Sequence, residues 1–176
     1  LLIGRAGVDI YPDPPGTKTE NAKSFVTHLG GSSANMGVQL TLFGGNCNLL
    51  TRVSDDALGR FAINQLNHYG VKNKLVKFEK NETRISFAIV ETTVKDHQSI
   101  IYRHKASDLF LNNDDIENAN IQNFDCVLIT GTCLAAEPSR SSTLYALDIA
   151  NKNNIPVIMD IDYRPYTWES SKKAKE

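Results

Sequence analysis

The sequence has few cysteines, almost no net charge and no long apolar run. Its 176 residues include three cysteines, none in a C-x-x-C pair, and its formal net charge is -1. This cysteine usage argues against a disulfide-stapled fold and favours a reducing compartment, so we expect a cytoplasmic protein. No basic excess is available to attract nucleic acid or an anionic membrane, and no run approaches the roughly 18 apolar residues of a membrane span. We therefore expect no nucleic acid and no membrane as partners.

Motifs of several common enzyme classes are missing as well. The four histidines show no ligand spacing to one another or to the cysteines, so a metal site is not expected. The segment Pro14–Lys18 lacks the order of a phosphate-binding P-loop, and Gly4–Gly7 lacks the glycine spacing of a dinucleotide-binding turn. No Gly-x-Ser-x-Gly segment of a hydrolase is present. These absences leave the polar residues at strand and helix ends as candidates for a site.

What the sequence does contain is a regular alternation of apolar segments. The apolar fraction of 41% suits one globular domain. Segments of strand character alternate with segments of helical periodicity, which predicts an α/β fold with a mostly parallel sheet covered on both faces. We expect strands at 1–10, 48–53, 126–130 and 155–161, and helices at 33–43, 58–69 and 138–152.

Three further segments break this alternation. The segments 85–92 and 99–103 are typical of two strands joined by a short polar turn, and therefore predict an antiparallel hairpin. Another short strand is expected at 22–29, before Gly30. We expect these strands to form a small separate sheet.

The most distinctive local segment is Gly30–Asn35, which opens the first expected helix. Two glycines permit the close approach of a ligand, and a helix start offers backbone N–H donors. Asn35 adds one donor and one acceptor, which suits a hydroxyl group. From these residues alone, an equally good interpretation is that the glycines end a strand and Ser33 caps the helix.

Three charged residues are further candidates. Asp9 ends the first expected strand, and its two carboxylate oxygens suit two adjacent hydroxyls, although a turn or cap role is the alternative. Arg103, on an expected strand, and Arg164, after another, could each hold a carboxylate or a phosphate, or form a surface ion pair. Ligands of open parallel sheets bind at the carboxyl ends of the strands, so we expect Asp9, Arg164 and Gly131–Thr132 along one edge.

Taken together, these segments resemble the ribokinase-like (pfkB) carbohydrate kinases over essentially the whole chain, 1–176. A strand ending in Gly and Asp (Gly4–Asp9), a Gly-Gly-x-x-x-Asn helix start (Gly30–Asn35) and the segment Ser54–Gly59 follow one another in the family's order. More narrowly, the chain resembles the branch that phosphorylates 5-dehydro-2-deoxygluconate in inositol breakdown. The segments that carry this narrower resemblance are Gly4–Ala6, Tyr102–Arg103, Ala106–Leu109, Gly131–Thr132 and Asp160–Trp168.

The resemblance implies a ribokinase-like domain with a β lid, formed by segments of about 11–30 and 84–105, and a homodimer formed through this lid is a further expectation. It also implies that Asp9, Gly30, Gly31 and Asn35 bind sugar hydroxyls. By similarity to 2-keto-3-deoxygluconate kinases, it implies that Arg103 and Arg164 bind the carboxylate of a small acid sugar.

The resemblance also marks what this chain does not contain. The family's catalytic Asp lies in a Gly-Ala-Gly-Asp helix start beside the ATP pocket, and no such segment occurs here. The sequence also begins with Leu1 within a strand-like run, so we expect an N-terminal portion without a catalytic residue, inactive alone. The intact enzyme would use ATP and Mg²⁺. A 2-keto-3-deoxygluconate kinase, a fructokinase and a non-catalytic sugar-binding module are the alternatives.

Overall fold

The structure contains two β-sheets, of which the larger carries the helices. It is a computed structural model that describes residues 1–80 and 82–175. The five-stranded main sheet is parallel throughout, and its mostly parallel α/β class is as expected. Its strands in spatial order are β5 (Val76–Glu79), β4 (Leu49–Ser54), β1 (Leu2–Ile3), β8 (Val127–Thr130) and β9 (Val157–Asp160).

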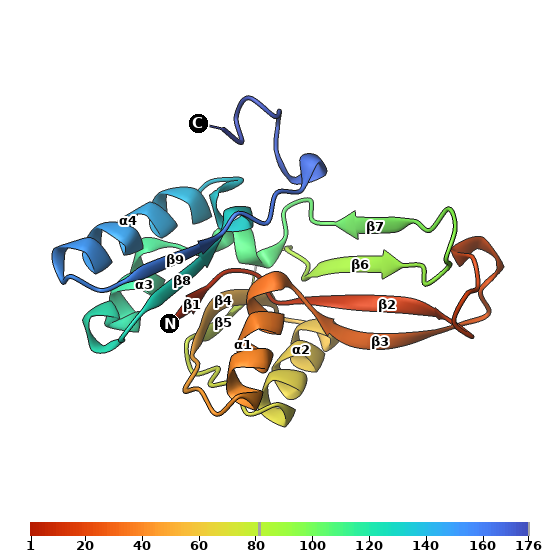
Figure 1. Ribbon diagram of the computed structural model, residues 1–176, viewed down its shortest axis with the longest axis horizontal. Coiled ribbons are helices and arrows are strands. Elements are labelled where there is room, and N and C mark those ends of the chain that lie inside the picture. The colour runs from red at the N-terminus through yellow and green to blue at the C-terminus, as the bar shows by residue number, and fades with distance from the viewer. Residues whose placement is uncertain (81, 176) are drawn as a thin grey trace.

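The second sheet, called the lid sheet below, projects from one side of the main sheet (Figure 1). The pairing of β6 (Ser86–Val90) with β7 (Ser99–Tyr102) is antiparallel, which confirms the expected hairpin, whereas β2 (Gly7–Asp13) and β6 run parallel. The lid sheet begins at Gly7, earlier than the expected segment 11–30. Its strands in spatial order are β3 (Ser24–Gly30), β2 (Gly7–Asp13), β6 (Ser86–Val90) and β7 (Ser99–Tyr102).

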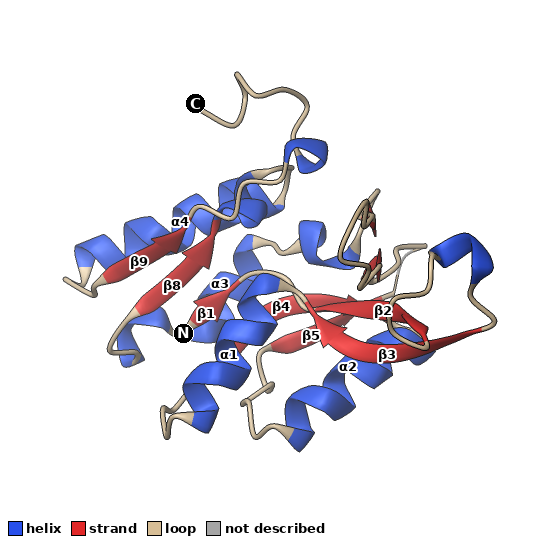
Figure 2. Ribbon diagram, turned by 45° about the vertical axis from the view of Figure 1, so that its right-hand side comes forward, coloured by secondary structure: helices blue, strands red, loops and turns tan. Residues whose placement is uncertain are grey.

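Helices cover both faces of the central strands. Successive strand side chains point to opposite faces, so Leu2 joins the core under α1 (Ser32–Leu42) and α2 (Ala57–His68). Ile3 joins the core under α3 (Asn113–Ala119) and α4 (Ser139–Lys152). Figure 2 shows the two pairs of helices on opposite sides of the sheet. The edge strand β9 differs, because Val157, Ile158 and Met159 are 43%, 55% and 48% exposed.

The prediction of one strand over 1–10 is wrong. The chain leaves the main sheet after Ile3 and enters the lid sheet at Gly7, so the first segment contributes to both sheets. The break follows from close packing, because a Cβ atom on Gly4 would overlap the side chain of Ser33. Asp9 consequently lies inside a lid strand and not at the end of a main-sheet strand. Asp9 is therefore not among the residues at the carboxyl ends of the main-sheet strands, which corrects the expectation of a single edge shared with Arg164 and Gly131–Thr132.

The helix starts agree with the sequence in one case and differ in the other. Asp56 caps α2, since its Oδ1 accepts from the backbone N–H groups of Leu58 and Gly59 at 3.0 Å each. The predicted Ser33 cap of α1 is wrong, because Gly31 holds the cap position and makes no side-chain bond. The hydroxyl of Ser33 instead contacts Thr130 and the carbonyl of Ile3 inside the protein.

Two elements that the sequence pattern did not reveal, β5 and α3, are held by a cluster of charged side chains. Arg52 on β4 donates to Asp115 on α3 at 2.7 Å and forms an ion pair with Glu79 on β5. Lys77 adds a 2.8 Å contact to Asp115. Burial acts to raise the pKa of Asp115, but the hydrogen bonds from Arg52 and Lys77 outweigh it and hold that pKa below its usual value.

Replacing Asp56 with Ala is expected to lower the free energy of unfolding by about 1 kcal/mol, because α2 loses its cap. Urea denaturation at pH 7 measures this loss, with Asp55→Ala at the exposed neighbouring position as the control. Burial tends to raise the pKa of Asp56, but its hydrogen bonds from Gly59, Ser54 and Leu58 bring it below the usual value. The difference between wild type and Asp56→Ala should therefore hold at neutral pH and shrink as the pH falls through that lowered pKa. Equal losses for the two variants would contradict the prediction.

Candidate functional site

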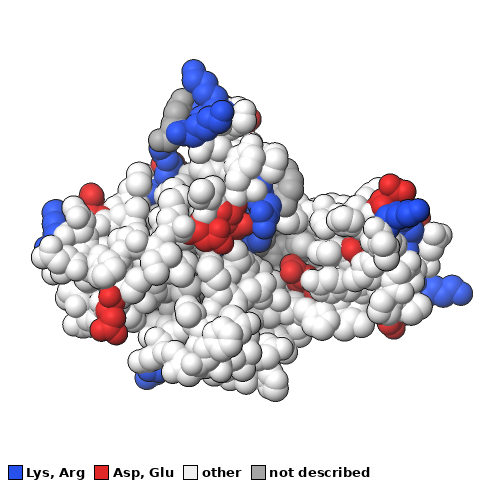
Figure 3. Space-filling model, viewed as in Figure 1, with Lys and Arg blue, Asp and Glu red and all other residues white. Residues whose placement is uncertain are grey.

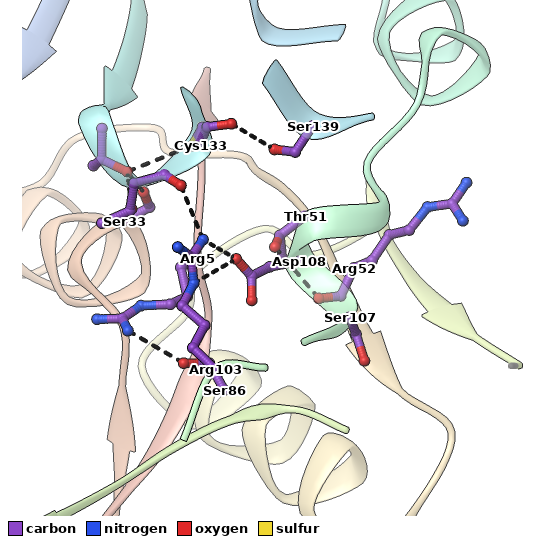
Figure 4. A network of polar contacts seen from close by, with 12 residues as sticks. Arg5, Ser33, Thr51, Arg52, Ser86, Arg103, Ser107, Asp108, Cys133 and Ser139 are labelled. Atoms are coloured by element: carbon purple, nitrogen blue, oxygen red, sulfur yellow. Dashed lines mark hydrogen bonds and ion pairs between the residues drawn. The ribbon is translucent and has the colours of Figure 1, made fainter. Parts of the chain in front are cut away.

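Polar side chains from distant segments meet where the carboxyl ends of β1 and β8 reach the start of α1. Ser33 Oγ lies 3.5 Å from both Thr130 Oγ1 and the carbonyl oxygen of Ile3. Thr130 Oγ1 in turn lies 2.9 Å from Thr132 Oγ1. Figure 4 shows Ser33 beside Cys133 within a network of polar contacts. It fixes the position of α1 relative to the edge of the main sheet, where ligands of such sheets bind.

The glycines of the segment Gly30–Asn35 allow two backbones to pass with no side chain between them. A Cβ atom on Gly30 would overlap the carboxylate of Asp9, and one on Gly31 would lie 2.9 Å from Cα of Ala6. Gly31 also has φ 95°, which favours glycine. The backbone N–H of Ala34 donates to the carbonyl of Arg5 at 3.2 Å, so that amide of the helix start is already in use. The segment is therefore a packing element as well as a candidate binding element.

Asp9 and Asn35 line the same cavity, of about 530 Å³, between β2, β3 and the first turn of α1. His28 lies opposite Asp9 in the strand pair, and its ring packs edge-on against Tyr11 with centroids 5.3 Å apart. Burial raises the pKa of Asp9 above its usual value, while Arg5 and His28 oppose the rise. An acidic acceptor and an amide thus face one concave space, an arrangement that suits a ligand with several hydroxyls.

Arg103 lies at the base of the lid and is not a surface residue. Its side chain is 6% exposed and pairs with Asp108, which is 3% exposed. Nη2 also donates to the carbonyl oxygen of Thr132 at 3.0 Å, while Nη1 is buried without a hydrogen-bond partner among the described residues. Arg103 lines a second cavity, of about 900 Å³, together with Tyr102 and Glu137. The structure therefore places Arg103 and Asp9 on the linings of different cavities.

Arg164 lies after β9, and its side chain is 46% exposed. Its Nη2 contacts Oδ1 of Asp162 at 3.0 Å, and Asp162 itself is nearly buried with φ 37°. The linings of the two cavities do not include Arg164. Of the predicted site residues, Asp9, Gly30, Gly31 and Asn35 come together, and the two arginines lie apart from them.

Sequence reasoning did not identify several residues that shape the site. The sequence gives Asp108 no role of its own and indicates Thr132 only as a residue at the end of a strand, yet both hold Arg103 in place. Tyr11 and His28 line the cavity of Asp9. Alternation along β2 and β3 was the available signal for them, because Asp9 and Tyr11 are two residues apart and so point to one face.

The surface shows no single dominant charge on the face seen in Figure 3. Acidic and basic side chains form small separate groups there, and the surface is hollowed where the lid sheet meets the main body. Among the described residues, the longest apolar helical stretches fall short of what a membrane crossing requires.

The fold, a parallel α/β sheet with a second sheet projecting from it, is that of the pfkB carbohydrate kinases. The sequence profile described as pfkB family carbohydrate kinase matches residues 1–176, and the chain belongs to this family. Among curated relatives, it is 34% identical to the 5-dehydro-2-deoxygluconokinase of Photobacterium profundum over 99% of the chain. It is 36% identical to the enzyme of the same name from Clostridium beijerinckii over 96% of the chain. The chain spans about half of these relatives, 53% and 50% of their lengths.

Solved structures share the fold at low sequence identity. The PfkB protein of Polaromonas sp. JS666 matches with a TM-score of 0.90 at 17% identity, covering 99% of this chain and 59% of that one. The 2-dehydro-3-deoxygluconokinase of Thermotoga maritima has a TM-score of 0.83 at 21% identity, with coverage of 95% and 52%. A fructokinase of Xylella fastidiosa with bound ATP has a TM-score of 0.85 at 19% identity, with coverage of 99% and 56%.

Replacing Asp108 with Asn is expected to lower the free energy of unfolding by about 3–5 kcal/mol, because the buried guanidinium of Arg103 loses its counter-charge. The double variant Arg103→Met with Asp108→Leu should recover most of this loss, since no buried charge is left unpaired. Chemical denaturation of both variants measures the difference, with exposed Asp148→Asn as the control. If the double variant is no more stable than the single one, burial of an unpaired charge is not the cause.

Replacing Gly30 with Ala is expected to displace the carboxylate of Asp9 while costing little stability, because the overlapping atoms are the end of one side chain. In a protein that comprises this chain and the family's remaining half, KM for the sugar should rise by about tenfold or more. Gly37→Ala, where a Cβ would meet its nearest neighbour at 3.3 Å, serves as the control for adding a methyl group. An unchanged KM with a shifted melting temperature would mean that Asp9 does not bind the sugar.

Proposed function

We propose that this chain is the sugar-binding portion of an ATP-dependent kinase. In the whole protein, the γ-phosphate of ATP would pass to a terminal hydroxyl of 5-dehydro-2-deoxygluconate, a step of inositol breakdown. The observation that carries the proposal is the shared cavity of Asp9 and Asn35 at the junction of the lid and main sheets. The names of the curated relatives support the choice of substrate.

Each candidate residue has a chemical role in this proposal. The carboxylate of Asp9 accepts hydrogen bonds from two adjacent hydroxyls, and the amide of Asn35 both donates and accepts. Gly30 and Gly31 leave room for the sugar to approach the backbone. Arg103 would donate to the carboxylate from Nη1, which has no hydrogen-bond partner among the described residues. Arg164, which follows β9, would donate to the same carboxylate.

ATP and Mg²⁺ belong to the proposal for the whole protein. Among residues 1–80 and 82–175, no group of three or more acidic, His or Cys side chains is arranged to hold a metal ion, so we assign Mg²⁺ to none of them. The ATP pocket and the catalytic Asp are proposed to lie in the family's remaining half, so the 176 residues alone would be inactive. A cytoplasmic location and a homodimer formed through the lid are further parts of the proposal. Edge strand β3 exposes Phe25 and Val26 at 40% and 44%.

The alternatives differ in substrate or in class. The fold is shared with a 2-dehydro-3-deoxygluconokinase and a fructokinase, so those two activities remain candidates. A non-catalytic sugar-binding module is the alternative of another class. The gene separates these classes, because a kinase requires a Gly-Ala-Gly-Asp segment downstream of residue 176, and a stop codon directly after it would overturn the kinase proposal.

The substrate is tested by assaying the protein encoded by the whole gene with 5-dehydro-2-deoxygluconate, 2-keto-3-deoxygluconate and fructose. We expect the highest kcat/KM with the first sugar. Replacing Arg103 with Met together with Asp108→Leu, which leaves no buried charge unpaired, should lower kcat/KM for the acid sugars by about tenfold or more and for fructose by less than about threefold, because only the acids present a carboxylate. Unchanged kinetics with the acid sugars would remove Arg103 from the binding site. A preference for fructose would overturn the acid-sugar proposal itself.

A further inference from the structure

Three arginines lie near the junction of the two sheets, and they differ in what neutralises their charge. Arg103 pairs with Asp108, and Arg164 pairs with Asp162. Arg5, in the connection from β1 to β2, forms no ion pair with a carboxylate among the residues that the structure describes. Arg5 therefore differs from Arg103 and Arg164 in having no direct counter-charge in the described part of the chain.

The contacts of Arg5 place it between the start of β6 in the lid sheet and the start of α1. Its Nη1 donates to Ser86 Oγ at 3.2 Å, at the start of β6. Its own carbonyl accepts the amide of Ala34, and Gly31 packs against the same carbonyl. Figure 4 shows the guanidinium of Arg5 turned toward Ser86, whereas that of Arg103 is turned toward Asp108. Arg5 thus touches the helix start that holds Asn35.

The side chain of Arg5 is also incompletely satisfied. Its Nε is buried and has no hydrogen-bond partner among the described residues. A buried N–H without a partner costs about 1–3 kcal/mol, and a charged one costs more, so such a group in a native protein calls for an explanation. A ligand that supplies two acceptor oxygens is one explanation, because the guanidinium fork matches a carboxylate.

Asp9 fixes where that ligand would lie. Arg5 is close enough to Asp9 for its charge to oppose the pKa rise that burial causes there. Ser86 pairs with Gly7, two residues before Asp9, so the hydroxyl that holds Arg5 lies on the same face of the lid sheet as Asp9, although the linings of the two cavities do not include Arg5. Asp9 and Arg5 together present an acceptor for hydroxyls and a donor for an acid group.

We infer that Arg5 binds the carboxylate of the sugar substrate and is a specificity-determining residue for acid over neutral sugars. The inference rests on the proposed function, because it requires a sugar bound at Asp9 and Asn35. The competing explanation is that Arg5 only fastens the lid to the main sheet through Ser86. The variant Ser86→Ala separates the two, since it removes that bond and leaves the guanidinium in place.

The test is a kinetic comparison in the protein encoded by the whole gene, with 2-keto-3-deoxygluconate as the acid probe and fructose as the neutral probe. Replacing Arg5 with Met should lower kcat/KM for the acid by about thirtyfold or more, mostly through KM, and for fructose by less than about threefold. Arg5→Lys should recover part of the preference, because it keeps the charge and loses the fork. Ser86→Ala and the exposed Arg60→Met should each retain the preference of the wild type.

The outcomes are distinguishable. If the wild type prefers the acid and Arg5→Met lowers activity equally on both sugars, Arg5 has only a structural role and the inference is overturned. The same holds if Ser86→Ala reproduces the whole effect of Arg5→Met. A wild type that acts on fructose and not on the acid overturns the proposed substrate class instead. If Arg5→Met does not fold, Arg5→Lys decides, because unchanged discrimination in that variant together with an unchanged KM for the acid overturns the inference.

Discussion

The connection from β1 to β2 passes so close to the start of α1 that no side chain fits between them. Gly4 lies against Ser33 and Thr130, and Gly31 lies against the backbone of Arg5 and Ala6. This backbone contact fixes the point at which the chain leaves the main sheet for the lid. The cavity lined by Asp9 and Asn35 depends on it, because the lid strand that carries Asp9 and the helix that carries Asn35 both begin there.

The charges around this contact are arranged so that most are neutralised within the protein. Arg103 and Arg52 are paired with carboxylates that are themselves almost fully buried. Buried pairs of this kind contribute little net stability compared with apolar packing, but each fixes the position of its partners, because separating them leaves a charge without solvation. The Arg103 pair positions the base of the lid against Thr132, and the Arg52 cluster positions β5 and α3. Arg5 and Asp9, the latter in the lining of the cavity beside Asn35, belong to none of these pairs.

Sequence periodicity was sufficient to locate the elements that are stabilised by apolar packing. It located α2, α4, β4 and β8 within a residue or two, because burial imposes a regular spacing on their side chains. It missed α3 and β5, since these elements span only 7 and 4 residues and combine a few apolar contacts with the ion pairs of Asp115 and Glu79, which leaves too short an apolar pattern. It also merged β1 with β2, because the choice between two sheets depends on the distant residues Ser33 and Thr130.

The candidate site likewise contains residues that were expected before the structure and interactions that were not. The meeting of Asp9 with Asn35 was expected from the family resemblance, whereas the local pattern wrongly placed Asp9 at the end of a main-sheet strand. The hydrogen bonds of Arg103 could not be predicted from the sequence, because they depend on Asp108 and Thr132 lying close to Arg103 in space. An arginine in a motif indicates that a positive charge is needed. Only the three-dimensional arrangement shows whether a carboxylate of the protein already pairs with that charge.

The lid sheet is tied together by contacts of its own, which limits where it can move. Near its tip, Glu91 accepts hydrogen bonds from the backbone N–H groups of Thr19 and Gln98 at 2.8 and 3.1 Å and pairs with Lys18. These bonds, that from Thr19 first, lower the pKa of Glu91 to about 2, so the carboxylate keeps its partners throughout the neutral range. Because the tip is held in this way, the lid would move as a unit about the connections at its base. Arg5 lies in one of these connections, so the proposed contact between Arg5 and the sugar carboxylate would link the ligand to the base of the lid sheet.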